Sequence, residues 1–515
     1  MARAAAMVAA VAVVAIYLLR LNRAAGLMVD DAYYVLLASA LAEGRGYRLI
    51  SSATVEMLPL YPPGFPFVLS LVFRMMPVFP DNVLLLKSVS VAAMLATALL
   101  TLVYLRQRQM ATVVSGAAAL AVGTMPALVF LATSTVMSEC VFTVVQLGAV
   151  VALNLAAGAD ERRAVRLIAA AAVLTACVVL IRSAGVSLAL AVVLWLATRR
   201  EWKRVALFGA VTALCVLPWM IYARQHAPST EERHQHGGAV VYSYQEQVWM
   251  RWAGSPRSGT ATIVDLPARM ATNTIDVFGR GLVGMFAPVL LRGPAESGEE
   301  VVSLGGRVGI RMGSMGNTLP TMIVSCMFGG LVVLGYAVTA RRQLRLAEFL
   351  VPVATAVVLV WPFWSFRFLL PLSPYLFGYF AAGLRTLGTD RAAHVVLLTV
   401  IGLNVADHGA YIALGRSGQD QESRIWLAEA RDADAALEWM DRHAEGVVAT
   451  TNPALVYLET GLKTISFDGS VEELHGRTDV PIRYVACLVR QQPPDSRHFE
   501  LVFQAPGGFW VARVR

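Results

Sequence analysis

Long apolar runs alternate with short polar segments over most of the chain. Each run is close to the ~20 residues that an α-helix needs to cross a bilayer. Eleven runs predict membrane-spanning helices, at 5–22, 82–105, 110–131, 136–157, 166–181, 185–198, 204–222, 318–340, 346–363, 369–386 and 392–412. The runs at 166–181 and 185–198 are the shortest. The pattern predicts an all-α polytopic membrane protein.

Basic residues are concentrated in alternate segments between these runs. The clusters are Arg106 and Arg108; Arg162, Arg163 and Arg166; Arg199, Arg200, Lys203 and Arg204; Arg341, Arg342 and Arg345; and Arg385 and Arg391. Because Lys and Arg accumulate in cytoplasmic loops, the N-terminus with Arg3 is expected inside and the C-terminus outside. The first run could instead be a cleavable signal peptide. We favour a retained span, since no clear small-x-small cleavage site precedes Asp30.

One apolar stretch does not fit this alternation. If residues 63–79 spanned the membrane, every later loop would change sides and the basic clusters would face outward. The stretch also contains Pro66, ends near Pro77 and carries Arg74. We therefore predict that it lies at the outer interface or dips into it.

The segments outside the predicted spans form two outer loops and a tail. The loops are expected at 23–81 and 223–317, and an apolar patch at 282–291 suits a second interface helix. Loops and spans together make a membrane module at 1–413, followed by a small α/β domain at 414–515. In that domain the pattern predicts a helix at 425–443, a strand from Gly446, further strands at 463–467, 483–489, 498–503 and 509–514, and a turn at Gly507-Gly508.

Composition supports a membrane protein and excludes several other classes. Hydrophobic residues make up 57% of the 515 residues and charged residues only 15%, against about 25% charged in an ordinary soluble domain. So few charges exclude a soluble enzyme and a disordered chain. The five cysteines have no paired or CxxC spacing, which argues against a disulfide scaffold and a zinc site.

The formal charge of +8 has three possible origins: nucleic-acid binding, an anionic membrane surface and membrane topology. The tail from residue 414 holds 11 Lys and Arg against 15 Asp and Glu, a net −4, which leaves +12 on the membrane module. That excess lies in the alternate basic segments. The positive charge is therefore mainly a topology signal and gives no support to nucleic-acid binding.

The most informative polar residues are Asp30 and Asp31, just past the outer end of the first span. A helix pattern begins there, and an acid at a helix start can cap the helix and suits its dipole. That structural role accounts for one carboxylate but not for two beside a membrane surface. The alternative role is a general base that deprotonates an acceptor hydroxyl or amine.

Four more ionisable residues are expected on the same outer side. Charges at membrane depth cost ~2.5–3.5 kcal/mol on insertion scales and usually mark a site. Glu139 begins the span after the one that ends at 131, Lys87 lies one turn into the span that follows 63–79, and Arg182 and Arg367 lie at outer turns. Snorkelling explains a lone Lys or Arg. Acidic and basic residues on the same side suit proton removal and phosphate binding. Arg182 could be one of the residues that bind the phosphate.

Two other patterns are less specific. Three histidines at 226, 234 and 236 fit no standard metal spacing, so we expect a solvated loop and no metal site. The aromatic run at 361–366 (WPFWSF) suits an interface belt. Because it lies beside the expected site, it can also serve as a sugar platform.

The order of these motifs resembles a known family. VDDAYYVLLASALAEGRGY follows the first span, and YPPGFPFVLSL, VLLLKSVSV, TSTVMSECVF and FRFLLPLSP come after it in that order. Over residues 1–390 this order is similar to the GT-C glycosyltransferases, specifically the protein-mannosyltransferase and aminoarabinose-transferase-like group. Each motif is loose, but their joint order is specific.

The resemblance implies a polytopic enzyme that uses a polyprenyl-phosphate-linked sugar and needs no other cofactor and no metal. It implies that Asp30 is the catalytic base, that Asp31 supports it and that Glu139 lines the acceptor site. Lys87 and Arg367 would bind the donor phosphate. The pair is Asp-Asp where many relatives have Asp-Glu, and the residue after Arg367 is Phe where a Tyr is usual.

We therefore expect direct, inverting displacement at the anomeric carbon, at the outer face of a bacterial cytoplasmic membrane. The acceptor, whether lipid, polysaccharide or protein, is not specified by the sequence. Two other classes stay open. A transporter or flippase of lipid-linked sugars would show repeats between its halves, and none is found in the sequence. A receptor or scaffold would use the loops and the tail for binding, with the acids dispensable.

Overall fold

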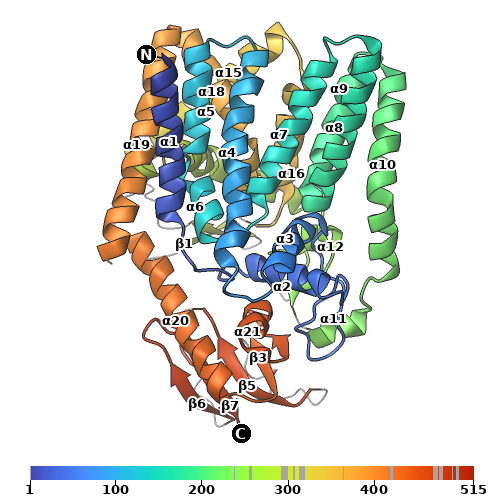
Figure 1. Cartoon of the computed structure of the whole chain (residues 1–515), viewed down its shortest axis with the longest axis vertical. Helices are drawn as coiled ribbons and strands as arrows, with labels where there is room; N and C mark the ends of the chain where they lie inside the picture. The colour runs from blue at the N-terminus through green and yellow to red at the C-terminus, as the bar shows by residue number, and fades with distance from the viewer. Residues whose placement is uncertain are drawn as a thin grey trace.

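A computed structural model describes residues 2–236, 238–253, 258–291, 300–304, 308–312, 319–363, 365–417, 421–467, 474, 480–489, 491–493 and 498–515. A bundle of long helices carries short helices and a small α/β domain at one end, and the N-terminus lies at the other (Figure 1). We call the first the domain end. The second is the basic end, because the helix termini with the Arg and Lys clusters lie there (Figure 1).

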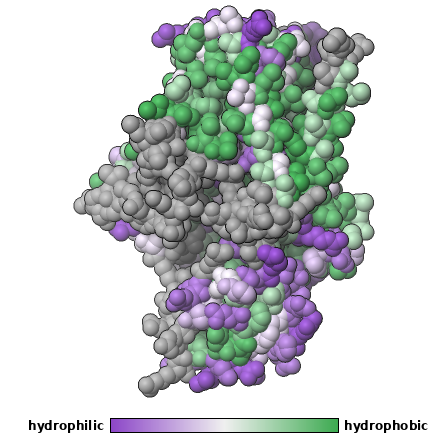
Figure 2. Space-filling view, turned by 90° about the vertical axis from the view of Figure 1, so that its left-hand side faces the viewer, coloured by the Kyte–Doolittle hydropathy of each residue, from purple (hydrophilic) through white to green (hydrophobic). Residues whose placement is uncertain are grey.

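The bundle is apolar where it would meet lipid. Among the described residues, six helices are long and apolar enough to cross a membrane, and a bent pair makes a seventh candidate. Figure 2 shows one face of the molecule, on which the described part of the bundle is apolar and polar residues gather toward both ends. The chain is therefore a multi-pass membrane protein, and the number of eleven spans stays a prediction. The bundle helices are α1 (Ala2–Arg20), α4 (Val83–Gln107), α5 (Thr112–Gly123), α6 (Pro126–Ser134), α7 (Glu139–Ala156), α8 (Glu161–Ile181), α9 (Val186–Thr198), α10 (Trp202–Gln225), α15 (Leu319–Arg342), α16 (Leu346–Val360), α18 (Ser373–Leu387) and α19 (Asp390–Ser417).

The run predicted as one span at 110–131 is divided. Helices α5 and α6 meet at an angle of 43°. Pro126 opens α6, and Met125 before it is extended, with φ −64° and ψ 117°. A proline has no N–H to donate and disfavours helical backbone at the residue before it. Hydrophobic periodicity hides this break, since both halves are apolar.

A buried ion pair joins several helices at the basic end. Glu348 is fully buried, and Arg108 donates to it at 2.7 Å. The Tyr379 hydroxyl donates to the same carboxylate at 2.9 Å. These bonds tie the end of α4 and helix α18 to the first turn of α16. The removal of either charge would leave the other buried and unpaired, which is strongly destabilising.

Two short helices lie at the domain end, α2 (Asp30–Ala42) and α3 (Gly64–Met75). Helix α3 covers the stretch expected at the interface, and at 12 residues it is about 18 Å long, too short for a hydrocarbon core of about 30 Å. Phe67, Leu71 and Met75 form an exposed apolar stripe on α3 at helical spacing. Gly64 begins the helix against the α8 backbone, because a Cβ there would lie 2.7 Å from the Leu180 carbonyl oxygen.

The second outer segment folds onto the bundle. Its described helices and strands are α11 (Thr230–His236), α12 (Tyr244–Val248), α13 (Leu266–Asp276), α14 (Leu282–Phe286), β1 (Glu300–Leu304) and β2 (Val308–Met312). Another short helix, α17 (Ser365–Leu369), follows α16. The expectation of an interface helix at 282–291 is wrong for its first half, because α14 is buried. Phe286 packs against Phe377 and Phe380 of α18, with ring centroids 4.2 and 4.8 Å apart.

The tail is an α/β domain, as the sequence predicts. It contains α20 (Gln421–His443), β3 (Val447–Thr450), α21 (Pro453–Thr460), β4 (Thr464–Ser466), β5 (Ile482–Cys487), β6 (Phe499–Gln504) and β7 (Trp510–Val514). The strand order is β4-β3-β5-β7-β6. Strands β4, β3 and β5 are parallel, and β6 and β7 form the predicted hairpin around Gly508, whose φ is 89°. Helix α21, not expected from the pattern, follows β3.

Candidate active site

A cavity of about 1200 Å³ lies between the bundle and the C-terminal domain. Its wall is built from α2, the segment before α3, the α8–α9 turn, residues 238–253, α16, residues 361–372 and three loops of the domain. Among the described lining residues the charged side chains are Asp30, Arg182 and Arg367. Three of the six residues expected at the site therefore line one cavity. The other three, Asp31, Glu139 and Lys87, lie behind its wall.

Asp30 is presented by an unusual turn. Val29 has φ 63° and ψ −58°, and the Asp30 N–H donates to the Met28 carbonyl at 2.7 Å. This is a γ-turn of the rarer kind, with positive φ at its centre. A β-branched residue pays about 1–3 kcal/mol of strain in such a conformation, and strain of this kind clusters at functional sites. The turn places Asp30 at the first position of α2, pointing into the cavity.

Arg367 links two carboxylates. Its Nη2 donates to Asp30 Oδ2 at 2.7 Å, and its Nε donates to Glu139 Oε1. Arg182 Nη1 also contacts Glu139 Oε1, at 2.9 Å. The four side chains carry two positive and two negative charges. Glu139 is fully buried and holds both guanidinium groups, so in this structure it orients the arginines and does not itself line the cavity.

Three hydroxyl groups that were not predicted as site residues complete this network. The Tyr61 hydroxyl donates to Asp30 Oδ1 at 2.6 Å. Arg182 donates to Ser138 Oγ at 2.9 Å, and Ser138 donates to the Tyr34 hydroxyl at 3.2 Å. Burial, and then the Asp30 charge, raise the pKa of Tyr61 well above its ordinary value. Tyr61 therefore stays a proton donor to the carboxylate.

Asp31 is fully buried and serves the backbone. It accepts hydrogen bonds from the N–H groups of Gly26 at 2.8 Å and Met28 at 3.0 Å. Burial is the main reason why the pKa of Asp31 rises from 3.8 to about 6, against a lowering by the Gly26 N–H. Neither Asp acts as a simple side-chain cap of α2, since the cap residue is Val29 and its side chain accepts no bond.

Lys87 does not line the cavity. Its ammonium donates to the Ala24 carbonyl at 2.6 Å, the Asn22 carbonyl at 2.7 Å and Asn22 Oδ1 at 3.1 Å. An ammonium has three N–H donors, so all of them are taken up. In this structure no Lys87 N–H is left for a donor phosphate, and phosphate binding by Lys87 stays a prediction. Lys87 instead fixes the 22–24 segment that leads to the acidic pair.

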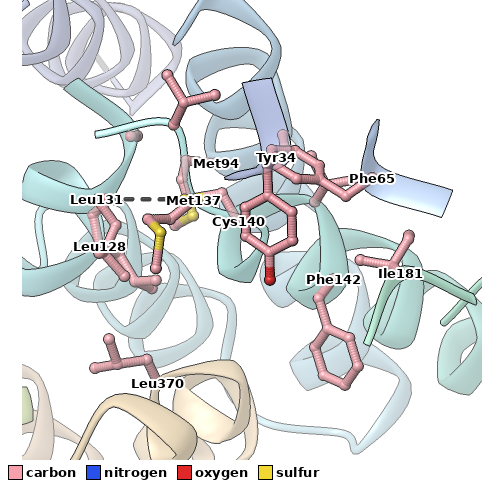
Figure 3. Packing of buried hydrophobic residues seen from close by; sticks show 14 of the residues in the cluster. Tyr34, Phe65, Met94, Leu128, Leu131, Met137, Cys140, Phe142, Ile181 and Leu370 are labelled. Atoms are coloured by element: carbon pink, nitrogen blue, oxygen red, sulfur yellow. Dashed lines mark hydrogen bonds between the residues drawn. The ribbon is translucent and has the colours of Figure 1, made fainter. Parts of the chain in front are cut away.

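The cluster beneath these residues is tightly packed. Figure 3 shows Tyr34 among Phe65, Cys140, Phe142 and Ile181, from α3, α7 and α8. The rings of Tyr34 and Phe65 meet edge to face, with centroids 5.2 Å apart. The packing holds α2 against α7, so that Asp30 and Glu139 can share one arginine.

Aliphatic side chains of the bundle line one part of the cavity, and aromatic side chains of the segment after α16 line another. Val353, Ala356 and Val357 of α16 and Leu190 of α9 line the bundle side. The aromatic run at 361–366 reaches the cavity through Trp361 and Phe363, and Trp364 lies outside the described residues. Those two rings therefore face a binding space, so an interface belt does not fully describe them.

The histidine segment at 226–236 is not the fully solvated loop that was expected. His236 is buried, and its Nδ1 accepts from the Gly238 N–H at 3.3 Å. The side chain of His234 lies outside the described residues. Across the described part of the chain, no group of three His, Cys, Asp or Glu is arranged to hold a metal ion.

Sequence comparison finds no matching family model and no matching curated protein. Solved structures do match. AglB, the archaeal oligosaccharyltransferase from Archaeoglobus fulgidus in complex with an inhibitory peptide and a dolichol-phosphate, is similar with a TM-score of 0.53 and 15% identity, over 94% of this chain and 68% of that chain. ArnT from Cupriavidus metallidurans, bound to undecaprenyl phosphate, is similar with a TM-score of 0.50 and 14% identity, over 100% of this chain and 98% of that chain.

The chain has the GT-C fold. This confirms the fold class and the structural resemblance expected from the motif order. At such low identity the likeness establishes the GT-C fold alone. The activity must therefore be argued from the cavity and its charged residues.

Proposed function

We propose that the protein is a membrane glycosyltransferase that moves a sugar from a polyprenyl-phosphate donor to an acceptor hydroxyl or amine. The observation that carries this proposal is the position of Asp30. Its carboxylate lines the same cavity as Arg182 and Arg367 and contacts Arg367 at 2.7 Å. A base and two phosphate-binding cations are the groups that such a transfer needs.

The bundle side of the cavity suits the donor. Its aliphatic wall from α9 and α16 matches a polyprenyl chain, and the two arginines line the same cavity. One of the two similar structures is in complex with a dolichol-phosphate and the other is bound to undecaprenyl phosphate, which supports a lipid-phosphate donor here. Arg182 and Arg367 would bind its phosphate, in competition with their present carboxylate partners.

The domain side of the cavity suits the acceptor. The lining residues there follow the carboxyl ends of three parallel strands: Thr451 after β3, Ser466 and Phe467 at β4, and Gln491 after β5. Ligands of open α/β sheets bind outside these strand ends. Hydroxyl and amide side chains at this edge can hydrogen-bond a polar acceptor and direct it toward Asp30.

The mechanism is a direct displacement. Asp30 takes the proton of the acceptor as the acceptor oxygen or nitrogen bonds to the anomeric carbon. The bond from that carbon to the phosphate oxygen breaks, and its electron pair leaves with the polyprenyl phosphate, which Arg182 and Arg367 stabilise. The anomeric centre inverts, since one displacement occurs. Asp31 and Glu139 hold the base and the arginines in place.

The orientation follows from the basic end. Because its Arg and Lys clusters would face the cytoplasm, the domain end with the cavity would lie in the periplasm of a bacterial cytoplasmic membrane. Protease added to intact spheroplasts that contain the protein tests this orientation. We expect protease added outside the spheroplasts to remove the C-terminal domain. Protection of the domain would contradict the orientation.

Native mass spectrometry of the purified protein tests the donor class. We expect the protein to carry a polyprenyl phosphate that co-purifies with it or is added to it. The Arg182→Gln and Arg367→Gln variants should retain less of this lipid. Proteoliposomes with a synthetic polyprenyl-phosphate sugar and a membrane extract that supplies the acceptor then separate an enzyme from a transporter. An enzyme releases free polyprenyl phosphate, whereas a flippase moves the intact lipid across the bilayer. Binding without either change would favour a receptor.

A further inference from the structure

The segment before α2 is held from two sides. On the bundle side, the Lys87 ammonium binds the Asn22 and Ala24 carbonyls. On the opposite side, Asn452 of the C-terminal domain donates from Nδ2 to the Gly26 carbonyl at 2.7 Å. Residues 22–29, here called the acid loop, therefore lie clamped between a buried membrane-side lysine and the start of α21.

The contact at Gly26 is close and specific. Gly26 has φ +84°, and a Cβ on it would lie 2.6 Å from Leu455 Cδ1, so a side chain would clash with α21. The same residue is bound on both sides, because the Gly26 N–H donates to Asp31 Oδ2 at 2.8 Å while its carbonyl accepts from Asn452. A continuous path of hydrogen bonds thus runs from Asn452 through Gly26 to Asp31, next to Asp30.

The acid loop needs such support. It ends in the γ-turn with Val29 at φ 63°, a conformation that persists only where the surroundings over-determine it. Asn452 is itself well fixed: it is buried, and its Oδ1 accepts the Leu455 N–H at 3.3 Å as the cap of α21. One side chain therefore caps a helix of the domain and binds the loop that carries the acids.

The domain is anchored elsewhere by separate contacts. The Thr464 N–H donates to the Ser51 carbonyl at 2.8 Å, and the Ala53 N–H donates to the Thr464 carbonyl at 2.9 Å. Lys463 donates to the Ile50 carbonyl at 2.8 Å. The edge of the sheet is thus extended by residues 51–53, and docking of the domain does not depend on Asn452 alone.

We infer that the C-terminal domain is part of the catalytic unit and that Asn452 is a positioning residue for the acidic pair. This inference rests on the proposed function of Asp30. Asn452 is not among the residues that line the cavity, although its neighbours Thr451 and Pro453 are. It holds the Gly26 carbonyl and so fixes the residue whose N–H binds Asp31. This support also keeps the strained turn that directs Asp30 into the cavity.

Two variants isolate the contact. Asn452→Asp and Asn452→Ser both keep an oxygen that can cap α21. An ionised Asp has no hydrogen to donate to the Gly26 carbonyl, and the single Ser hydroxyl cannot take the places of both Oδ1 and Nδ2. Lys463→Met is the matched control, because it removes a docking contact of the same domain far from the acid loop. The full-length protein in detergent is used throughout, and thermal unfolding checks that each variant is folded.

Hydrogen–deuterium exchange measures how well the backbone amides of the acid loop are protected, and it needs no enzymatic activity. We expect the amides of residues 26–30 to exchange at least tenfold faster in both Asn452 variants and unchanged in Lys463→Met. Unchanged exchange in either folded Asn452 variant would overturn the inference. Since this readout needs no turnover, it decides the matter even if the proposed transfer fails in the wild type.

Turnover of a synthetic polyprenyl-phosphate sugar gives the second readout. We expect kcat to fall at least tenfold in the Asn452 variants, with the donor KM within twofold of wild type and Lys463→Met near wild type. A merely structural contact would lower the amount of folded protein and leave kcat per folded molecule intact. That result, or an equal loss in Lys463→Met, would contradict a positioning role.

Discussion

Replacement of Arg367 by Gln tests the charge cluster at the centre of the site. The Asp30, Glu139, Arg182 and Arg367 side chains balance in charge, and Arg367→Gln leaves them with one net negative charge. The Glu139 side chain is 0% exposed and that of Arg367 17%, so this contact is a buried ion pair. The Asp30 side chain is 30% exposed, which makes its pair with Arg367 worth about 1 kcal/mol or less.

The expected cost comes mainly from Glu139. Removal of one partner of a buried ion pair costs about 3–5 kcal/mol. Arg182 remains 2.9 Å from the same carboxylate oxygen, so we expect the lower limit, about 3 kcal/mol, for Arg367→Gln. Glu139→Gln should cost a similar amount, since it leaves two buried arginines without their shared partner. The double variant restores charge balance and should cost less than the sum of the two single variants.

Denaturation in mixed micelles, followed by tryptophan fluorescence, measures these differences. Arg442→Gln is the control, because Arg442 pairs with Glu438 on the exposed surface and should change stability by about 0.5 kcal/mol or less. Turnover should not recover in the double variant, since Arg367 is proposed to bind the phosphate. Strictly additive costs, or an Arg367→Gln protein as stable as Arg442→Gln, would refute a coupled buried cluster.

Three further outcomes are expected. Tyr61→Phe removes the 2.6 Å hydrogen bond to Asp30 and should lower kcat about tenfold, a loss of about 1.4 kcal/mol, without lowering the unfolding temperature; a wild-type rate would contradict a role for that hydroxyl. Val29→Gly relaxes the γ-turn, so turnover should fall while stability does not, and a large loss of stability would show that the turn is unstrained. Turnover should fall as pH drops through about 6, because burial raises the pKa of Asp31 to about 6 and its protonated form cannot accept both loop N–H groups. The pKa of Asp31 in the folded state lies above its value in the unfolded state, so its protonation stabilises the fold as pH falls from 6 to 4. Activity that is lost only together with unfolding would therefore contradict this assignment.

Much of the fold follows from local patterns in the sequence. Long apolar runs mark the bundle helices, and alternation with a glycine turn marks the β6–β7 hairpin, because both signals depend on residues close together in the chain. The break before Pro126 and the burial of α14 were not predicted. An apolar segment reads the same whether it packs against lipid or protein, so hydropathy cannot separate an interface helix from a buried one.

The site was predicted in part. Asp30, Arg182 and Arg367 stand out because charges beside a membrane are rare. The same reasoning cannot tell Lys87 from Arg367, since both are lone cations at one face and only tertiary contacts show that the Lys87 ammonium is taken up by carbonyls. Tyr61 and Asn452 carry no such signal. An uncharged residue in an outer loop or in a separate domain becomes part of the site only through the docking of distant segments.

A single-turnover experiment with Asp30→Asn tests the central claim most directly. Purified wild type and Asp30→Asn are each loaded with a synthetic polyprenyl-phosphate sugar and mixed with a membrane extract that supplies the acceptor, and bound donor, released polyprenyl phosphate and glycosylated product are quantified over time. We predict that both proteins bind the donor, that only the wild type releases polyprenyl phosphate, and that the product has inverted anomeric configuration. Release by Asp30→Asn at a rate near that of the wild type would show that Asp30 is not the base.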